Sequence, residues 1–138
     1  QWDLVLKYLE TKGTAQAYLK TNSTNWGNYN NNLWNITNEN SKYKNGSRWT
    51  NGAYGKKESN ENVLLSTGAS ETFSKQGIYD IAGNAREWTL EYTSYSSYPC
   101  ASRGGNYGRN GNGDPAVTRG IYGTTSYFDA LGFRVSLY

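Results

Sequence analysis

The chain has 138 residues, a length at which a single domain can bury a substantial core. The net charge is only +3 without a long basic run, and no apolar stretch reaches membrane-spanning length, so we expect neither nucleic-acid binding nor membrane insertion. The sequence contains no histidine, which removes the commonest metal ligand and general base.

The N-terminal segment carries apolar residues at helical spacing. Trp2, Val5, Leu6 and Leu9 recur at the intervals that place side chains on one helix face, and Gly13 is a natural end point. The pattern predicts a helix over Trp2–Leu9 that packs on a core. Because the chain starts at Gln1 without Met or a signal peptide, we expect it to be part of a longer protein.

Residues 21–62 have a different composition. Asn is frequent, Gly and Ser recur, and Trp26, Trp34 and Trp49 are irregularly spaced. No helical or strand period persists for more than a few residues. Flexible linkers rarely carry three Trp, so we expect long ordered loops that these aromatic side chains anchor.

Two later segments alternate apolar and polar residues, as half-buried strands do. They predict strands over Glu87–Tyr92 and Phe133–Leu137. The apolar positions are Trp88, Leu90 and Tyr92 in the first segment and Phe133, Val135 and Leu137 in the second.

The second half of the chain contains three short motifs: GIYDIAGNAREW from Gly77, RGGNY from Arg103 and GFRV from Gly132. Gly83-Asn84 supplies a turn that tolerates unusual backbone angles. Gly104-Gly105 allows close backbone approach beside a sheet. We interpret Arg103 and Arg134 as buried, hydrogen-bonded structural residues.

In this order the motifs resemble those of the formylglycine-generating-enzyme (sulfatase-modifying factor) domain. The resemblance implies an α+β, C-type-lectin-like fold with short antiparallel strands and many loops. The first half resembles a branch of this family common in Firmicutes and their prophages. Residues 1–138 would then be the C-terminal part of one such domain.

The chemistry of the family does not transfer with the motifs. Its sulfatase-modifying enzymes use two cysteines after the RGGS motif, and the related iron-dependent sulfoxide synthases use histidines. The only cysteine here, Cys100, precedes Arg103. We therefore expect no enzymatic activity and no required cofactor.

Calcium is the one metal that the resemblance suggests. In the sulfatase-modifying enzymes, oxygen atoms around the GN-x-x-E-W motif hold calcium, and the matching positions are Asp80, Gly83, Ala85 and Glu87. Carboxylates and carbonyls are suitable calcium ligands. The alternative is that Asp80 caps a turn and Glu87 pairs with an arginine.

The tail, residues 101–138, has an unusual composition. It contains no Lys, Glu, Gln, Met or Trp, whereas residues 1–100 contain eight Lys, seven Glu, three Gln and five Trp. At that frequency the tail would hold roughly nine of them. No codon for these five residue types ends in a pyrimidine. Randomising the adenines of Asn codons, AAC or AAT, yields Tyr, Asp, Ser, Gly, Arg, Ile, Thr and Phe, but never those five.

The tail therefore resembles the variable region of a diversity-generating retroelement, which mutates the adenines of a template repeat during reverse transcription. Such retroelements diversify C-type-lectin-like proteins, with variable regions framed by motifs like RGG and GFRV. We place the variable region at about residues 106–130. The predicted ligand-binding residues are Tyr107, Arg109, Asn110, Asn112, Asp114, Thr118, Ile121, Tyr122, Tyr127, Phe128 and Asp129. The predicted frame residues, which we expect to be structural, are Arg103, Gly104, Gly105, Gly132, Phe133 and Val135.

Three functions remain open. The leading hypothesis is a non-catalytic ligand-binding module with a diversified surface, such as a phage receptor-binding protein or an adhesin on a virion or cell surface. Its partner would be a protein or glycan at a cell surface. The alternatives are an enzyme of the formylglycine-generating type or a degenerate relative, and a structural virion or surface protein.

Overall fold

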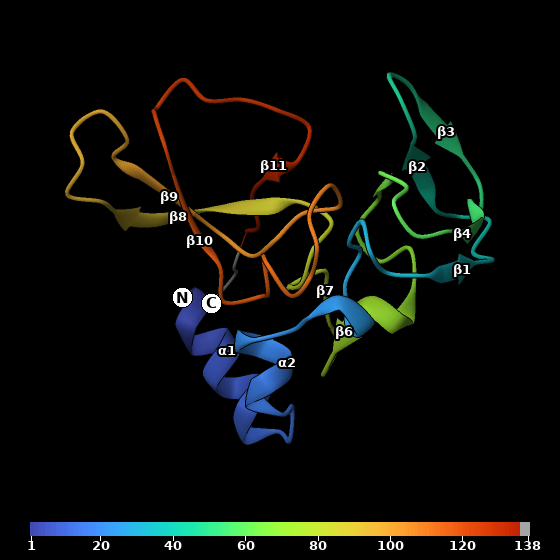
Figure 1. Cartoon of the computed structure of the whole chain (residues 1–138), viewed down its shortest axis with the longest axis horizontal. Coiled ribbons are helices and arrows are strands. Elements are labelled where there is room, and N and C mark those ends of the chain that lie inside the picture. The colour runs from blue at the N-terminus through green and yellow to red at the C-terminus, as the bar shows by residue number, and fades with distance from the viewer. Residues whose placement is uncertain (136–138) are drawn as a thin grey trace.

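The segment with apolar residues at helical spacing forms helix α1 (Trp2–Thr11), as predicted, and the short helix α2 (Gln16–Lys20) follows. The computed structural model describes residues 1–135. Trp2, Leu6 and Leu9 are buried because one face of α1 packs on the core while the other meets solvent. The two helices lie together at one end of the molecule (Figure 1).

Most of the remaining regular structure consists of short strands. The strands are β1 (Trp34–Ile36), β2 (Lys42–Lys44), β3 (Trp49–Asn51), β4 (Gly55–Lys57), β5 (Leu64–Leu65), β6 (Ser74–Lys75), β7 (Ile78–Tyr79), β8 (Arg86–Tyr92), β9 (Cys100–Arg103), β10 (Arg119–Tyr122) and β11 (Leu131–Gly132). Single 3₁₀ turns form η1 (Thr24–Trp26) and η2 (Glu71–Phe73). The described chain is therefore a mixed α+β domain, mostly strands with few helices. No helix within it has the length and apolar character needed to cross a membrane.

The largest sheet has the strand order β10-β9-β8-β11. Strands β8, β9 and β10 are antiparallel neighbours, whereas β11 pairs with β8 in parallel. A second sheet has the order β3-β2-β5, and β1 pairs with β4 and β6 with β7. The first sheet and the β1–β4 region lie on opposite sides of the molecule (Figure 1).

Two hydrophobic clusters form the core. The helical cluster comprises Trp2, Leu6, Leu9, Leu19, Trp26, Tyr29, Ile81, Ala82 and Ala116. The strand cluster comprises Trp34, Ile36, Val63, Leu65, Ala69 and Phe73. Trp26 and Trp34 thus anchor the Asn-rich loops as predicted. Trp49 does not, because it lies on β3 with 51% of its surface exposed, and that prediction is wrong.

The turn at Gly83-Asn84 connects the two clusters through a pair of buried amide side chains. Asn28 Nδ2 donates to Asn84 Oδ1 (3.0 Å) and to Val63 O (2.7 Å), while Asn84 Nδ2 donates to Leu65 O (2.9 Å). Gly83 and Asn84 have φ values of 72° and 57°, so the predicted unusual backbone angles are confirmed. A Cβ on Gly83 would lie 2.3 Å from Asn28 O, which explains why glycine is needed there.

The C-terminal strand differs from the prediction. Only Leu131–Gly132 pair with β8, and Phe133–Val135 lie outside any strand. Phe133 is 77% exposed and Val135 is also exposed, so their assignment as buried frame residues is wrong. Arg134 is hydrogen-bonded to Glu87 as predicted, but it is exposed, so its predicted burial is wrong. Since side chains alternate in an extended chain, Phe133 and Val135 point away from this ion pair. Residues 136 and 137 of the predicted strand lie outside the described residues.

The predicted strand over Glu87–Tyr92 forms as β8, but its burial differs from the expectation. Trp88 is half-buried, whereas Leu90 is 98% exposed and Tyr92 is also exposed. The pairing register of β8 with β9 shifts between Trp88 and Tyr92, and the connection between these strands projects from the body of the domain (Figure 1). The alternation predicted a strand correctly but not a buried face along its whole length.

Replacing Asn84 with Ala should destabilise the domain by about 3–5 kcal/mol, since buried groups lose their partners and Ala must adopt a positive φ. The matched control is Asn60→Ala. Asn60 also has a positive φ of 68° but an exposed side chain, so the control should lose only about 1 kcal/mol. Chemical denaturation of both variants measures the difference. Equal losses would contradict the buried amide network.

Replacing Phe133 with Ala should change the free energy of unfolding by about 0.5 kcal/mol or less, because most of the ring is already in water. The same substitution at Phe73, which is 1% exposed in the strand cluster, should destabilise by about 3–5 kcal/mol. Thermal and chemical denaturation of the two variants provides the comparison. A large loss of stability in the Phe133 variant would contradict the exposed position of this ring.

Candidate ligand-binding surface

The backbone of the first part of the predicted variable region, residues 106–130, is held by groups that precede residue 85. The bonds are Tyr107 N to Asn84 O (3.0 Å), Asn30 N to Arg109 O (2.9 Å), Ser23 N to Gly111 O (2.9 Å), Gly111 N to Asn31 Oδ1 (3.0 Å), Ala116 N to Ser23 Oγ (2.9 Å) and Val117 N to Leu19 O (3.0 Å). On the tail side, each bond uses a main-chain atom. Any residue type supplies the carbonyl and any except proline the N–H, so these anchors do not depend on the local side chains.

The RGG motif behaves as a structural element. Arg103 is buried, as predicted, and its guanidinium donates to the carboxylate of Asp3 on α1. Gly104 has a φ of 77° and donates its N–H to Thr118 O. A Cβ on Gly105 would lie 2.2 Å from Asp114 O, which confirms the expected close backbone approach.

None of the predicted ligand-binding residues is buried. The exposed ones are Arg109, Asn110, Asn112, Tyr127, Phe128 and Asp129. The half-buried ones are Tyr107, Asp114, Thr118, Ile121 and Tyr122. Side chains that vary in a binding protein need this accessibility, whereas Arg103, Gly104 and Gly105 just before them are buried.

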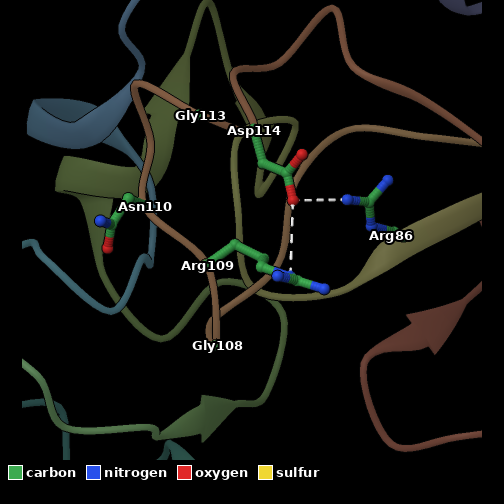
Figure 2. Close-up of a pocket in the computed structure, with 6 residues that line it drawn as sticks. All are labelled: Arg86, Gly108, Arg109, Asn110, Gly113 and Asp114. Atoms are coloured by element: carbon green, nitrogen blue, oxygen red, sulfur yellow. Dashed lines mark hydrogen bonds and ion pairs between the residues drawn. The ribbon is translucent and has the colours of Figure 1, made fainter.

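Residues 108–114 of the predicted variable region contribute to a polar pocket of about 530 Å³ (Figure 2). Its lining residues are Arg86, Gly108, Arg109, Asn110, Gly113 and Asp114. Arg86 Nη2 lies 2.5 Å from Asp114 Oδ2, and Arg109 Nε lies 3.9 Å from the same oxygen. Figure 2 shows the two guanidinium groups approaching this carboxylate from different sides. The pocket is within the volume range of small-ligand sites but has a polar lining.

A row of aromatic rings continues the surface over the sheet. The rings of Trp88 and Tyr122 meet edge to face with centroids 5.7 Å apart, and those of Tyr122 and Phe128 are 5.4 Å apart. We call these three residues the ring row. Tyr122 and Phe128 belong to the predicted variable region, whereas Trp88 comes from β8. Aromatic rings of this kind supply much of the energy at binding interfaces.

Gly120 joins the pocket to the ring row. A Cβ at this position would lie 3.0 Å from Arg86 Nη1 and 3.0 Å from Tyr122 Cε2. The arginine and the tyrosine therefore flank the same bare stretch of β10, and the absence of a side chain leaves room for both.

A third part of the surface involves β2. Lys44 Nζ lies 2.6 Å from Asp129 Oδ2, so the loop that follows β10 reaches the Asn-rich half of the chain. Burial raises the pKa of the nearby Tyr107 hydroxyl, the negative charge of Asp129 raises it further, and Lys44 opposes the rise. The surface thus combines tail residues with one from β2.

Not all predicted residues lie on this surface. Ile121 and Tyr122 are successive residues of β10, and successive side chains of a strand point to opposite faces. Ile121 therefore lies on the face away from the ring row. Thr118 precedes β10, where its carbonyl accepts the N–H of Gly104.

Sequence reasoning missed Arg86, Trp88 and Lys44 as members of the surface. Arg86 and Trp88 are two residues apart in a strand, so the alternation already placed them on one face. The sequence carried no corresponding signal for Lys44, whose contact with Asp129 spans 85 positions.

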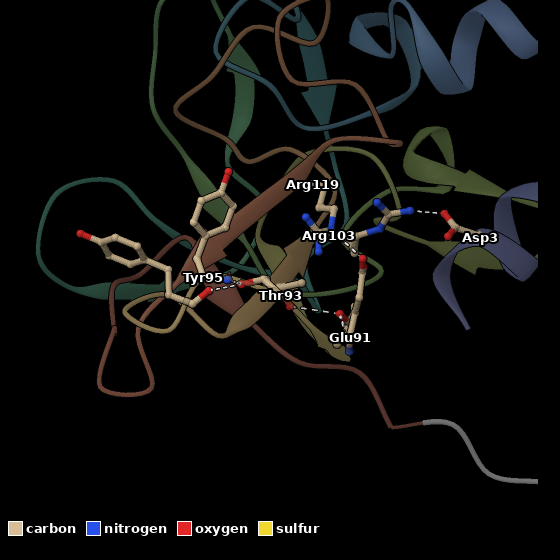
Figure 3. Close-up of polar contacts among 9 residues, drawn as sticks. Asp3, Glu91, Thr93, Tyr95, Arg103 and Arg119 are labelled. Carbon is tan, nitrogen blue, oxygen red and sulfur yellow. Dashed lines mark hydrogen bonds and ion pairs between the residues drawn. The ribbon is translucent and has the colours of Figure 1, made fainter.

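The other face of the sheet is occupied by ion pairs (Figure 3). Arg119 Nε donates to Glu91 Oε1 (2.6 Å), and Arg103 beside it pairs with Asp3. Since Arg103 and Arg119 are register partners on this face and Asp3 belongs to α1, it is the side on which α1 contacts the sheet. The ring row and the pocket lie on the face that α1 leaves open.

The proposed calcium ligands are committed to protein contacts. Both Glu87 carboxylate oxygens accept hydrogen bonds from Arg134, and Asp80 Oδ2 accepts the N–H of Gly68 (3.0 Å). Within residues 1–135, no three His, Cys, Asp or Glu side chains are grouped as a metal site requires. The arrangement matches the alternative in which Glu87 pairs with an arginine, and calcium at Asp80, Gly83, Ala85 and Glu87 stays a prediction.

Comparison of the chain with protein-family models, with curated proteins and with solved structures gives no match.

The stability of the domain should depend on pH through Asp80. Burial raises the pKa of this carboxyl from 3.8 to about 6, and the nearby Glu87 adds to the rise, although the Gly68 N–H and Arg134 counteract it. The folded state therefore binds more protons than the unfolded state between pH 4 and 6. The free energy of unfolding should fall by up to about 3 kcal/mol as pH rises through this window.

Asp80→Asn should remove this contribution, because the amide is neutral, can still accept from Gly68 and tolerates the φ of 55°. The variant should be more stable than the wild type at pH 7 and equally stable near pH 3. Denaturation curves at several pH values measure both proteins, and parallel curves would contradict the raised pKa. Calcium bound at Asp80 would hold the carboxylate ionised, so loss of the wild-type pH dependence on adding calcium would support the metal hypothesis.

Proposed function

We propose that the chain is a non-catalytic ligand-binding module of the C-type-lectin-like, sulfatase-modifying-factor type, and that residues 106–130 form a binding surface diversified by a retroelement. Such a module acts as a phage receptor-binding protein or as an adhesin at a virion or cell surface. Its partner is a protein or glycan exposed on a cell.

One observation carries the proposal. The backbone from Tyr107 to Val117 is anchored through its own main-chain atoms to earlier parts of the chain, while the predicted ligand-binding side chains remain accessible. A surface that must accept many sequences needs this separation, because substitutions then alter the ligand contacts without removing the bonds that hold the segment.

The composition of the surface supports the same function. Tyr provides a large contact area with little loss of conformational freedom, and Asn, Ser and Gly provide adaptable polar contacts, as in antibody binding sites. Tyr127, Phe128 and Arg109 are exposed, and arginine and aromatic side chains dominate binding hot spots. These residue types lie in the segment that lacks the five types inaccessible to adenine mutagenesis.

The enzymatic alternative has less support. Cys100 is half-buried on β9, where it lies opposite Tyr122 of β10, and no second cysteine occurs in the sequence. A formylglycine-generating mechanism with two cysteines therefore lacks its thiol pair. The structural alternative predicts no reverse transcriptase gene and no template repeat beside the coding gene, whereas the proposed function predicts both.

Simultaneous randomisation of Arg109, Asn110, Asn112 and Tyr127 to Tyr, Ser, Asn, Asp or Gly should leave most variants folded. Each site is exposed, so the average change per site should be about 0.5 kcal/mol or less. Protease resistance of the displayed variants measures folding. Selection of the folded pool against several unrelated surface proteins and glycans should then yield different binders for different targets.

The matched control randomises the frame residues Arg103, Gly104 and Gly105 in the same way. A Cβ on Gly105 would lie 2.2 Å from Asp114 O and one on Gly104 would lie 3.1 Å from the Trp2 ring, so most of these variants should unfold. Equal loss of folding in both pools, or a folded pool that yields no binders, would contradict the proposed function.

A further inference from the structure

The pocket in Figure 2 has an excess of positive charge. Arg86 and Arg109 contribute two cations, and Asp114 is the carboxylate between them. Asp114 forms its short contact with Arg86, whereas Arg109 lies 3.9 Å away and its side chain is 69% exposed. Arg109 is thus held only loosely by Asp114 and is accessible to a ligand.

The two arginines differ in origin. Arg86 belongs to β8, is largely buried and precedes the variable region, so diversification of residues 106–130 does not change it. Arg109 and Asp114 belong to the variable region. Residue 114 therefore controls how much of the fixed positive charge is neutralised from within the protein.

The residue types that adenine mutagenesis can place at position 114 are either acidic or neutral in this comparison. Asp is the acidic residue that adenine mutagenesis of an Asn codon provides, and Glu is not accessible. Asp at position 114 leaves the pocket with a net charge of about +1, whereas Asn, Ser or Gly leaves about +2.

We propose that the pocket binds an anionic group of the ligand, a carboxylate or a phosphate, with Arg86 as its fixed cation and residue 114 as the position that sets its affinity. Guanidinium groups bind both anions through paired N–H donors. The role of residue 114 rests on the proposed function, because it requires that this position vary. The anion site itself does not.

The experiment compares the wild type, Asp114→Asn and the double variant Asp114→Asn/Arg86→Met. Thermal unfolding is measured in inorganic phosphate and in acetate, each against chloride at equal ionic strength and the same pH. Asp114→Asn should melt below the wild type in chloride, since a buried guanidinium loses its partner. The binding anion should raise the melting temperature of Asp114→Asn more than that of the wild type, with an apparent Kd at least tenfold lower. It should leave the melting temperature of the double variant unchanged.

A second variant keeps the test valid if Asp114→Asn does not fold. Arg109→Gln retains the Arg86–Asp114 pair and changes an exposed side chain, so its melting temperature in chloride should equal that of the wild type. Its affinity for the anion should be at least fivefold weaker. Comparison of phosphate with acetate identifies which anion the pocket prefers.

Equal stabilisation of all variants by both anions would overturn the proposal, as would an Arg109→Gln variant with unchanged anion affinity. These results are independent of the folding of the randomised pools. The anion site can therefore fail while the diversified surface stands, and the reverse also holds.

Discussion

The paired amide side chains of Asn28 and Asn84 are the interaction on which the domain depends. Asn28 also accepts the indole N–H of Trp34, and Asn84 accepts the N–H of Leu65, so both side chains use donors and acceptors in a buried site. Buried polar groups are stabilising only when they are satisfied in this way. The carbonyl of Asn84 then accepts the N–H of Tyr107. One network therefore links the strand cluster, the helical side of the domain and the beginning of the predicted variable region.

This arrangement explains how loop-rich architecture can present an ordered surface. Few of the strands exceed four residues, so long ladders of backbone hydrogen bonds do not provide most of the order. Buried asparagines, buried tryptophans and glycines in close backbone contacts provide it instead. Each acts between segments distant in the chain. Some side chains of the predicted variable region do have structural contacts: Ala116 is buried in the helical cluster, and Asp114, Arg119 and Asp129 pair with Arg86, Glu91 and Lys44.

The predictable features were those with local causes. Helix α1 follows from the spacing of its apolar residues. The turn at Gly83-Asn84 and the close backbone approach after Arg103 follow from glycine and asparagine, for which few other residue types can substitute. The exposure of Phe133 was not predictable from alternation alone, because alternation does not reveal which of two faces is buried. Here the ion pair of Arg134 with Glu87 determines the choice. Similarly, the accessibility of the tail was predictable from its composition, but the contributions of Arg86 and Lys44 required the three-dimensional arrangement.

The parallel pairing of β11 with β8 has a consequence for the lengths that the two parts of the tail can tolerate. From Tyr107 to Val117, main-chain bonds recur every few residues, so an inserted residue would displace every later anchor from its partner. The loop between Tyr122 and Leu131 is secured mainly at its ends, by β10 and by β11 with the bond from Arg86 N to Ala130 O. Lengthening a loop with fixed ends changes its closure entropy only slightly. The first part of the tail can therefore evolve by substitution alone, whereas the second can also grow.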